Sequence, residues 1–269
     1  MNRRHYYYMY RKGRTSPPVT YEQLRRMATE FCVSCAAAGW FQLALGKDCV
    51  DARYDVGARV LRKLGMDIWP LERGLSDVDE DQLFTALEFL YQCVAKPTRS
   101  FDHVWNGCGI HVIEADVEKG RQLFRSQVND ILRLYSPSYE LRENGEIWEA
   151  TPSGLEDTAP ERTGDTSIDA RVESAIRSFR RHGATEDDKR HAIRDLADVL
   201  ELLKTTVGTR LPSADEDRLF EIANQFAIRH HNPRQRSEYD KGVWLDWMFH
   251  AFLNAIQLSA RLVKRSGTG

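Results

Sequence analysis

Apolar residues recur at helical spacing through much of the first 150 residues. This pattern predicts four helices. The first begins near Thr20 and has apolar positions up to Cys35, and the others span residues 55–64, 79–94 and 117–135. Thr20, with Gln23 three positions later, has the composition of a capping box. Gly65 is expected to end the second helix, and Pro97 stops the chain from continuing the third. The stretch 99–111, which carries Gly107 and Gly109, is predicted to be a loop.

Two short alternating runs lie between Tyr139 and Glu149 and meet at Asn144-Gly145. An Asn-Gly pair between alternating runs predicts a β-hairpin with a type I′ turn. Residues 151–167 contain few large apolar side chains and many turn formers, which is typical of a linker. The sequence therefore predicts an N-terminal domain over 1–150, a linker over 151–167 and a second domain over 168–269.

The second domain has helical periodicity throughout. Helices are expected over residues 168–182, 185–206, 215–228 and 243–264. The last of these is apolar around most of its circumference, which favours a central position in a bundle and a further contact with a second copy of the chain. The expected fold is mainly α, and α+β overall. It combines an N-terminal helical domain that carries a small β-hairpin with a C-terminal bundle of four to five helices, and a homodimer through that bundle is expected.

Composition and charge exclude several classes of protein. The 269 residues are 42% hydrophobic and 29% charged, with a formal net charge of −2, which argues against a generally basic nucleic-acid binder but leaves room for a local basic site. No run approaches 18 apolar residues, and no apolar stretch of signal-peptide type follows the basic N-terminus. Five cysteines, an odd number, indicate reduced thiols. A cytoplasmic protein without contact with a membrane is expected.

Two close pairs raise the question of a metal site. Cys32-x-x-Cys35 and Cys108-x-x-His111 have the pair spacing of zinc ligands. However, the first pair lies in an apolar helical stretch, where cysteine behaves as a small apolar residue. The sequence alone therefore favours no metal and no cofactor.

The segment 227–236 concentrates the polar groups that suit a phosphate site. It joins Arg229, His230, His231 and Asn232 to Arg234 and Arg236, and Pro233 forces the backbone to turn among them. The alternative is a solvated polar loop between two helices. A second candidate is His250, which with Asp246 four residues earlier belongs to a polar stripe on the last helix. That stripe could instead face solvent.

A resemblance to a known family arises from three stretches of the second domain. Residues 189–201, 219–232 and 244–249 resemble the C-terminal HEPN-type domain of abortive-infection proteins of the AbiJ kind, and residues 80–155 are similar to an N-terminal domain that accompanies it. The resemblance implies a helical bundle, often homodimeric, in a superfamily with many metal-independent ribonucleases of antiviral defence. Its active motif is an Arg followed after four to six residues by a His.

This chain departs from that motif. No His follows Arg229 at the required spacing, since His230 and His231 come too early and His250 too late. Arg177 and His182 have the spacing but stand at the end of the first helix of the domain. We expect an endoribonuclease of this type in which Arg229 holds phosphate, His230 or His231 acts as acid or base, and Asn232, Arg234, Arg236 and His250 contact RNA. His250 is an alternative source of the base. The alternative is a non-catalytic module that binds RNA or a nucleotide, as an antitoxin, sensor or scaffold; a phage-derived protein or a toxin–antitoxin partner is a further possible ligand.

Overall fold

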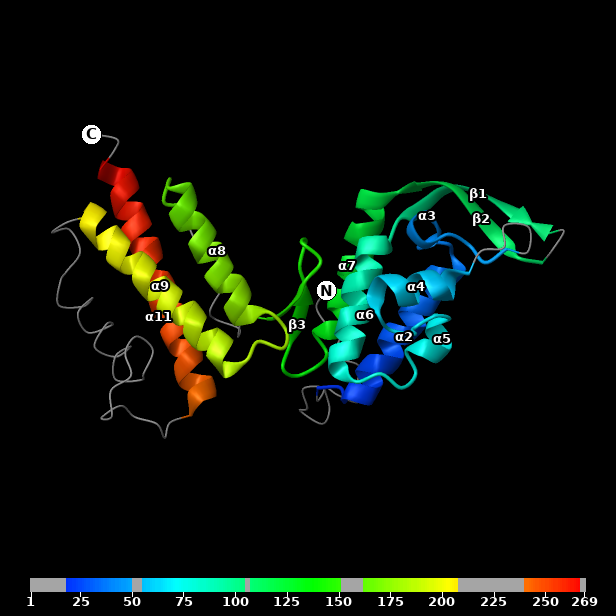
Figure 1. The fold of residues 1–269 in the computed structure, drawn as a ribbon, viewed down its shortest axis with the longest axis horizontal. Helices are drawn as coiled ribbons and strands as arrows, with labels where there is room; N and C mark the ends of the chain where they lie inside the picture. The colour runs from blue at the N-terminus through cyan, green and yellow to red at the C-terminus, as the bar shows by residue number, and fades with distance from the viewer. Residues whose placement is uncertain (1–17, 50–54, 105–106, 151–161, 208–239, 267–269) are drawn as a thin grey trace, which may run out of the picture. The chain divides into compact units, whose positions relative to one another are not determined.

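A computed structural model describes residues 18–49, 55–104, 107–150, 162–207 and 240–266. The chain divides into two compact units, Met1–Ala150 and Thr151–Gly269, which are described separately (Figure 1). The mainly α fold expected from the sequence is confirmed. Within the described ranges, no helix is long and apolar enough to cross a membrane.

The helices of the N-terminal unit largely follow the predicted ones. They are α2 (Tyr21–Ala37), α3 (Gln42–Leu45), α4 (Val56–Leu64), α5 (Leu71–Gly74), α6 (Glu80–Cys93) and α7 (Val117–Leu132). The capping box at Thr20 is present, with its side chain accepting from the Gln23 amide while the Gln23 side chain accepts from the Thr20 amide. Gly65 ends α4 in the left-handed conformation, as a C-terminal glycine is expected to.

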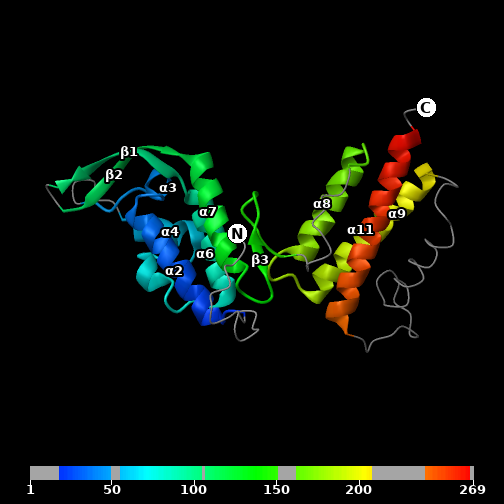
Figure 2. The same ribbon diagram turned by 180° about the vertical axis from the view of Figure 1, so that it is seen from behind.

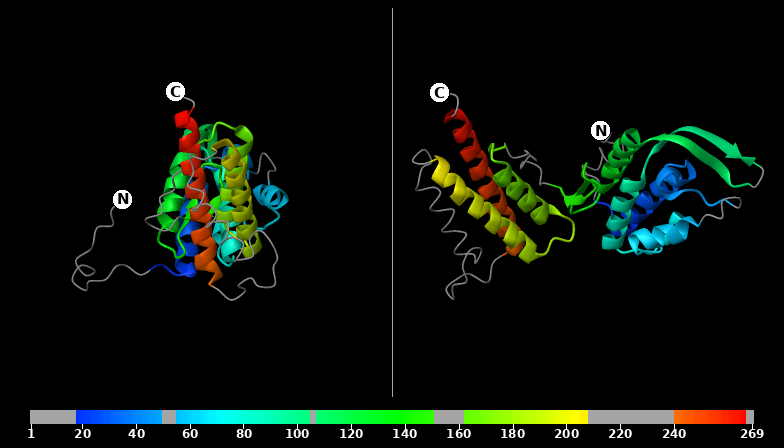
Figure 3. Two further views of the ribbon diagram at one scale, coloured as in Figure 1. Left: turned by 90° about the vertical axis from the view of Figure 1, so that its left-hand side faces the viewer. Right: turned by 45° about the horizontal axis from the view of Figure 1, so that its top comes forward.

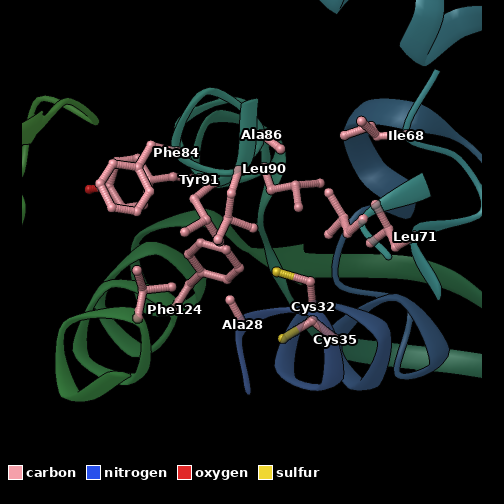
Figure 4. Close-up of a cluster of buried hydrophobic side chains, with 14 of the residues drawn as sticks. Ala28, Cys32, Cys35, Ile68, Leu71, Phe84, Ala86, Leu90, Tyr91 and Phe124 are labelled. Atoms are coloured by element: carbon pink, nitrogen blue, oxygen red, sulfur yellow. The ribbon is translucent and has the colours of Figure 1, made fainter. Parts of the chain in front are cut away.

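Phe124 of α7 lies at the centre of the N-terminal core. Its ring is fully buried and contacts Phe31 of α2, Phe41 before α3 and Tyr91 of α6, at centroid distances of 5.3, 6.2 and 6.5 Å. Figure 4 shows this ring between α2 and α6, with Cys32 and Cys35 of α2 among the neighbouring apolar side chains. One aromatic side chain therefore joins α7 to three other parts of the unit.

The predicted loop at 99–111 is wrong, because this stretch belongs to a β-hairpin. Strands β1 (Lys96–His103) and β2 (Gly109–Asp116) pair antiparallel, with His103 opposite Gly109 and Phe101 opposite His111. Figure 2, seen from behind, shows the hairpin as an arm extending beyond α3. Most of its side chains are exposed or half-exposed on both faces. The strands therefore lack the apolar alternation by which a half-buried strand is recognised.

The second hairpin occurs where it was expected. It consists of β3 (Tyr139–Leu141) and β4 (Ile147–Glu149). Its turn differs from the predicted two-residue type I′ turn, since the Arg142 amide donates to the Glu146 carbonyl and the Gly145 amide donates to the Arg142 carbonyl. The hydrogen bonds thus close a loop of residues 143–145, with Gly145 at φ 89°, as in three-residue hairpin loops.

The first hairpin continues directly into α7. Asp116 is the last residue of β2 and also the N-cap of α7, where its carboxylate accepts from the Lys119 amide. One turn later, Gly120 presses against the backbone of Ala95 and Lys96 at the start of β1; an added Cβ would lie 2.6–2.8 Å from those backbone atoms. Gly120 therefore permits a close approach that a larger residue would prevent.

The C-terminal unit is built from three described helices, α8 (Thr166–Arg180), α9 (Glu186–Val207) and α11 (Lys241–Ser266). Asp165 caps α8, and Thr185 and Asp188 bond reciprocally at the start of α9. Lys241 Nζ lies 2.9 Å from Glu186 Oε2, so the first turns of α9 and α11 meet. The two helices run in the same direction, as Figure 1 and both views of Figure 3 show. The expected helix at 215–228 lies outside the described residues.

Candidate functional site

Four sulfur and nitrogen donors converge where the tip of the first hairpin meets the segment after α3. They belong to Cys49, His103, Cys108 and His111, and the four ligand atoms lie within 4.8 Å of one another. Cys49 Sγ is 3.7 Å from Cys108 Sγ and 3.8 Å from His103 Nδ1. Cys108 Sγ is 3.0 Å from both His103 Nδ1 and His111 Nε2. The donors face a common point, and we refer to these four residues as the Cys/His cluster.

Asp48 anchors the side of the cluster that carries Cys49. Its carboxylate accepts from the Val56 amide at the start of α4, at 2.8 Å, and from Trp69 Nε1 at 3.3 Å. These two bonds hold the segment after α3 against the start of α4 and the Trp69 side chain. Cys49 itself is 9% exposed.

The hairpin side is held by Gln42 of α3. Its side-chain amide donates to the Ile110 carbonyl at 2.8 Å, and its side-chain oxygen accepts from the Val112 amide at 3.0 Å. These two bonds pair the amide with the backbone of β2 on either side of His111. Because both groups of Gln42 are used, the strand carrying His111 has a defined position beside α3.

Glycines on both sides of Cys108 shape the turn that presents its thiol. Gly107 and Gly109 have φ of 65° and 71°, values that other residues adopt at a cost. An added Cβ at either glycine meets no atom within 4 Å. Glycine is therefore favoured at these two positions by the backbone conformation and not by a lack of space. The ring of Phe101 stacks on that of His111, with centroids 5.3 Å apart and 25° between the planes. Phe101 therefore covers one face of that imidazole.

The thiols of the chain fall into two environments. Burial raises the pKa of Cys35 to about 12 and that of Cys93 to about 11, and it raises the pKa of Cys32 further. Partial burial, and after it the adjacent Cys49 thiol, raises the pKa of Cys108. Cys32 and Cys35 are core residues, as the sequence indicated. Sequence reasoning missed Cys49 and His103; the spacing His103-x4-Cys108-x2-His111, with its flanking glycines, is the signal that could have found part of the cluster.

In the C-terminal unit, His250 lies on the predicted polar stripe of α11. Its side chain is 12% exposed, and its Nε2 lies 3.9 Å from Asp246 Oδ1 one turn earlier. The imidazole is therefore largely buried and does not face open solvent, while Asp246 remains 41% exposed. Asn254 and Arg261 on the same stripe are exposed.

Cations and aromatic rings gather at the level of His250. The ring of Phe179 of α8 stacks on that of Phe249 of α11 at 4.0 Å. Arg180 lies over the Phe249 ring at 5.6 Å and Lys189 lies over the Phe179 ring at 5.3 Å. Positive charge is thus held next to the residue that precedes His250.

The structure describes only some of the other predicted site residues. Arg229, His230, His231, Asn232, Arg234 and Arg236 lie outside the described residues. Arg177 occupies the last turn of α8, and His182 follows two residues after that helix ends. The described part of the chain thus positions His250 but not the groups with which it was expected to act.

A polar cleft of about 720 Å³ lies on α7 and the second hairpin. Three arginines line it, and each has an acidic partner within 4 Å: Arg125 with Glu143, Arg133 with Asp130, and Arg142 with Glu140. Because these guanidinium charges are matched by carboxylates, the cleft offers little net attraction to an anion.

Comparison of the chain with protein-family models, with curated proteins and with solved structures finds no match.

Proposed function

We propose that the C-terminal unit is a HEPN-type helical bundle that cleaves RNA without a metal ion, in an abortive-infection protein of antiviral defence. The observation that carries this proposal is the Asp246–His250 pair, because it places a largely buried imidazole beside a carboxylate on a helix whose apolar side chains pack in the core of the unit. The resemblance of residues 189–201, 219–232 and 244–249 to that type of domain supports it from the sequence.

An imidazole beside a carboxylate suits proton transfer. Histidine changes charge near neutral pH, and an adjacent acid orients the ring and favours its cationic form. Burial limits the rotamers available to His250, which preserves that orientation. A histidine that served only to make the surface polar would face solvent, whereas the side chain of His250 is only 12% exposed.

The proposed reaction needs a proton acceptor, a proton donor and a cation at the scissile phosphate. One histidine accepts the proton of the ribose 2′-OH, whose oxygen then attacks the adjacent phosphorus. A second histidine donates a proton to the 5′-oxygen of the next nucleotide as that oxygen leaves. The products are a 2′,3′-cyclic phosphate and a 5′-OH. Arg229 supplies the paired hydrogen bonds to phosphate oxygens. His230 or His231 serves with His250 in acid–base roles, and Asn232, Arg234 and Arg236 contact RNA.

Chain length permits these groups to meet. His250 lies nine residues into α11, or about 14 Å along its axis at 1.5 Å per residue. Lys241 at the start of α11 comes ten positions after His231, and an extended chain over ten positions spans at most about 35 Å. The histidines of the two segments can therefore reach one site.

Arg229→Ala is expected to lower the rate of RNA cleavage by about 10²–10³-fold, the loss that follows removal of one charge-stabilising donor. The full-length protein would be incubated with total RNA, with Mg²⁺ and separately with EDTA added at the start of the reaction. The 3′ ends would then be tested for cyclic phosphate. Cleavage that needs Mg²⁺, or ends that carry 3′-OH, would contradict the proposed mechanism.

Arg171→Ala is the matched control, since Arg171 of α8 is 43% exposed and its partner Asp198 is 3.9 Å away. The control should retain cleavage, and neither variant should change the melting temperature appreciably. If Arg229→Ala unfolds the protein, that arginine is structural. RNA binding without cleavage in the wild type would support the alternative module that binds RNA or a nucleotide.

The proposal also includes a cellular location and a means of control. The five cysteines form no disulfide, which fits a reducing cytoplasm, where a ribonuclease of host defence would meet RNA. A trigger derived from phage, or a toxin–antitoxin partner, would control it.

A homodimer through the C-terminal unit is also proposed. Exposed apolar side chains follow α11 within the described part of the chain, including Val243, Trp244, Trp247 and Leu258. Light scattering of the full-length protein at tens of micromolar is expected to give about twice the 31.0 kDa of one chain. Trp247→Glu should shift the mass toward the monomer, whereas Leu61→Glu on α4 of the other unit, also at an exposed apolar position, should not. A wild-type mass near that of one chain would exclude the dimer.

A further inference from the structure

We propose that the Cys/His cluster of Cys49, His103, Cys108 and His111 binds one Zn²⁺ ion, which fastens the first hairpin to the helical part of the N-terminal unit. Two thiolates and two imidazoles are a common ligand set of structural zinc, and four protein ligands complete its tetrahedral shell. The proposed ion is therefore structural and has no open position for a substrate.

Two of the four distances between donors match a tetrahedral ion, and the other two are shorter. With Zn–S about 2.3 Å and Zn–N about 2.0 Å, two sulfurs lie about 3.8 Å apart and a sulfur and a nitrogen about 3.5 Å apart. Cys49 Sγ and Cys108 Sγ are 3.7 Å apart, and Cys49 Sγ and His103 Nδ1 are 3.8 Å apart. The two 3.0 Å contacts of Cys108 would open by about 0.5 Å to reach the tetrahedral value.

The chemistry of the donors selects the metal. The cluster contains no carboxylate, which disfavours Ca²⁺ and Mg²⁺, and a tetrahedral set of two sulfurs and two nitrogens favours zinc. A disulfide is the competing use of Cys49 and Cys108, but their 3.7 Å separation is far from the roughly 2.0 Å of an S–S bond. A disulfide would also leave both imidazoles without a shared ligand.

Hydrogen bonds hold both of the segments that carry the ligands. Asp48 fixes the segment that carries Cys49 through the Val56 amide and Trp69, while Gln42 fixes the strand that carries His111. The ligands thus come from two segments that are already positioned, and zinc joins residue 49 to residues 103–111 across more than 50 positions of sequence. Such outer contacts are what orient ligands in metal sites.

The experiment measures metal in the full-length protein, purified without a histidine tag and with thiols kept reduced. Elemental analysis is expected to find about one zinc per chain. Cys49→Ser and Cys108→Ser should lower zinc affinity by more than about 100-fold, beyond the 10–100-fold that loss of an outer partner costs. Cys93→Ala is the matched control, since Cys93 is buried on α6 outside the cluster, and it should keep the full zinc content.

A second measurement uses the wild-type protein, so it tests the site even if the ligand variants do not fold. Wild-type protein in which Co²⁺ replaces zinc should show the visible bands of a tetrahedral site together with thiolate-to-cobalt charge transfer. Zinc content well below one per chain, an octahedral cobalt spectrum, or full zinc content in a folded Cys49→Ser variant would each overturn the proposal. A Cys49–Cys108 disulfide found in freshly reduced, metal-supplied protein would also overturn it.

Discussion

Phe124→Ala is expected to lower the free energy of unfolding of the N-terminal unit by about 3–5 kcal/mol, the range for removing a buried aromatic ring. The upper part of this range is favoured because the ring is fully buried and contacts Phe31, Phe41 and Tyr91. Those partners lie on separate elements, so the space left behind cannot close by moving one side chain. For a unit of about 150 residues, the melting temperature should fall by roughly 6–20 °C.

Calorimetry can assign this loss to the correct unit. Phe124→Ala should lower one transition, and Phe249→Ala, which removes a buried ring of α11 stacked on Phe179, should lower another. Leu61→Ala is the surface control, since Leu61 is 47% exposed and should change stability by no more than about 0.5 kcal/mol. If both phenylalanine variants shift a single shared transition, the two units unfold together and do not behave as independent domains.

His250→Ala is expected to reduce the rate of RNA cleavage by about 10²–10⁴-fold, the usual contribution of a positioned acid or base. Asp246→Asn should have a smaller effect, because the carboxylate acts through the imidazole. It should also move the pH at which the rate changes, which a merely structural role of Asp246 would not do. The rates would be measured with a defined RNA over a range of pH, together with the melting temperature of each variant.

His191→Ala provides the control for this series, since His191 is exposed on α9 of the same unit. It should cleave RNA like the wild type. Because His250 is largely buried, His250→Asn tests whether a residue of similar shape restores the fold without restoring cleavage. Wild-type rates in a folded His250→Asn variant would remove His250 from the mechanism.

The helices were predictable because their signals are local. Thr20 with Gln23, Asp79 with Gln82 and Thr185 with Asp188 each form the reciprocal bonds that helix starts require. Apolar spacing then located the buried faces, as for Phe124 and Val128 of α7.

The first hairpin was missed for a physical reason. β1 contains Pro97, and its other positions are mostly polar and exposed, so neither face carries an apolar pattern. Its position depends on tertiary contacts such as those of Gln42 with β2, and the sequence does not display them.

The Cys/His cluster was hidden by distance along the chain. Cys49 lies 54 residues before His103, whereas Cys32 and Cys35 offered a close pair that packs in the core. Only the folding of the hairpin against α3 brings Cys49 to the other three residues. The polar stripe of α11, by contrast, was visible in the sequence, and the structure adds that His250 is largely buried.

The direction in which the first hairpin projects is set by the orientation of α7, because the two elements join at Asp116. Since one residue ends β2 and caps α7, no hinge residue separates the strand from the helix. Gly120 then fixes the rotation of α7 about its own axis by contact with Ala95 and Lys96. One residue inserted after Asp116 would turn the helix by about 100° relative to the strand, because a helix has 3.6 residues per turn. The length of chain at this joint therefore sets where the tip of the hairpin lies, and with it where His103, Cys108 and His111 meet Cys49.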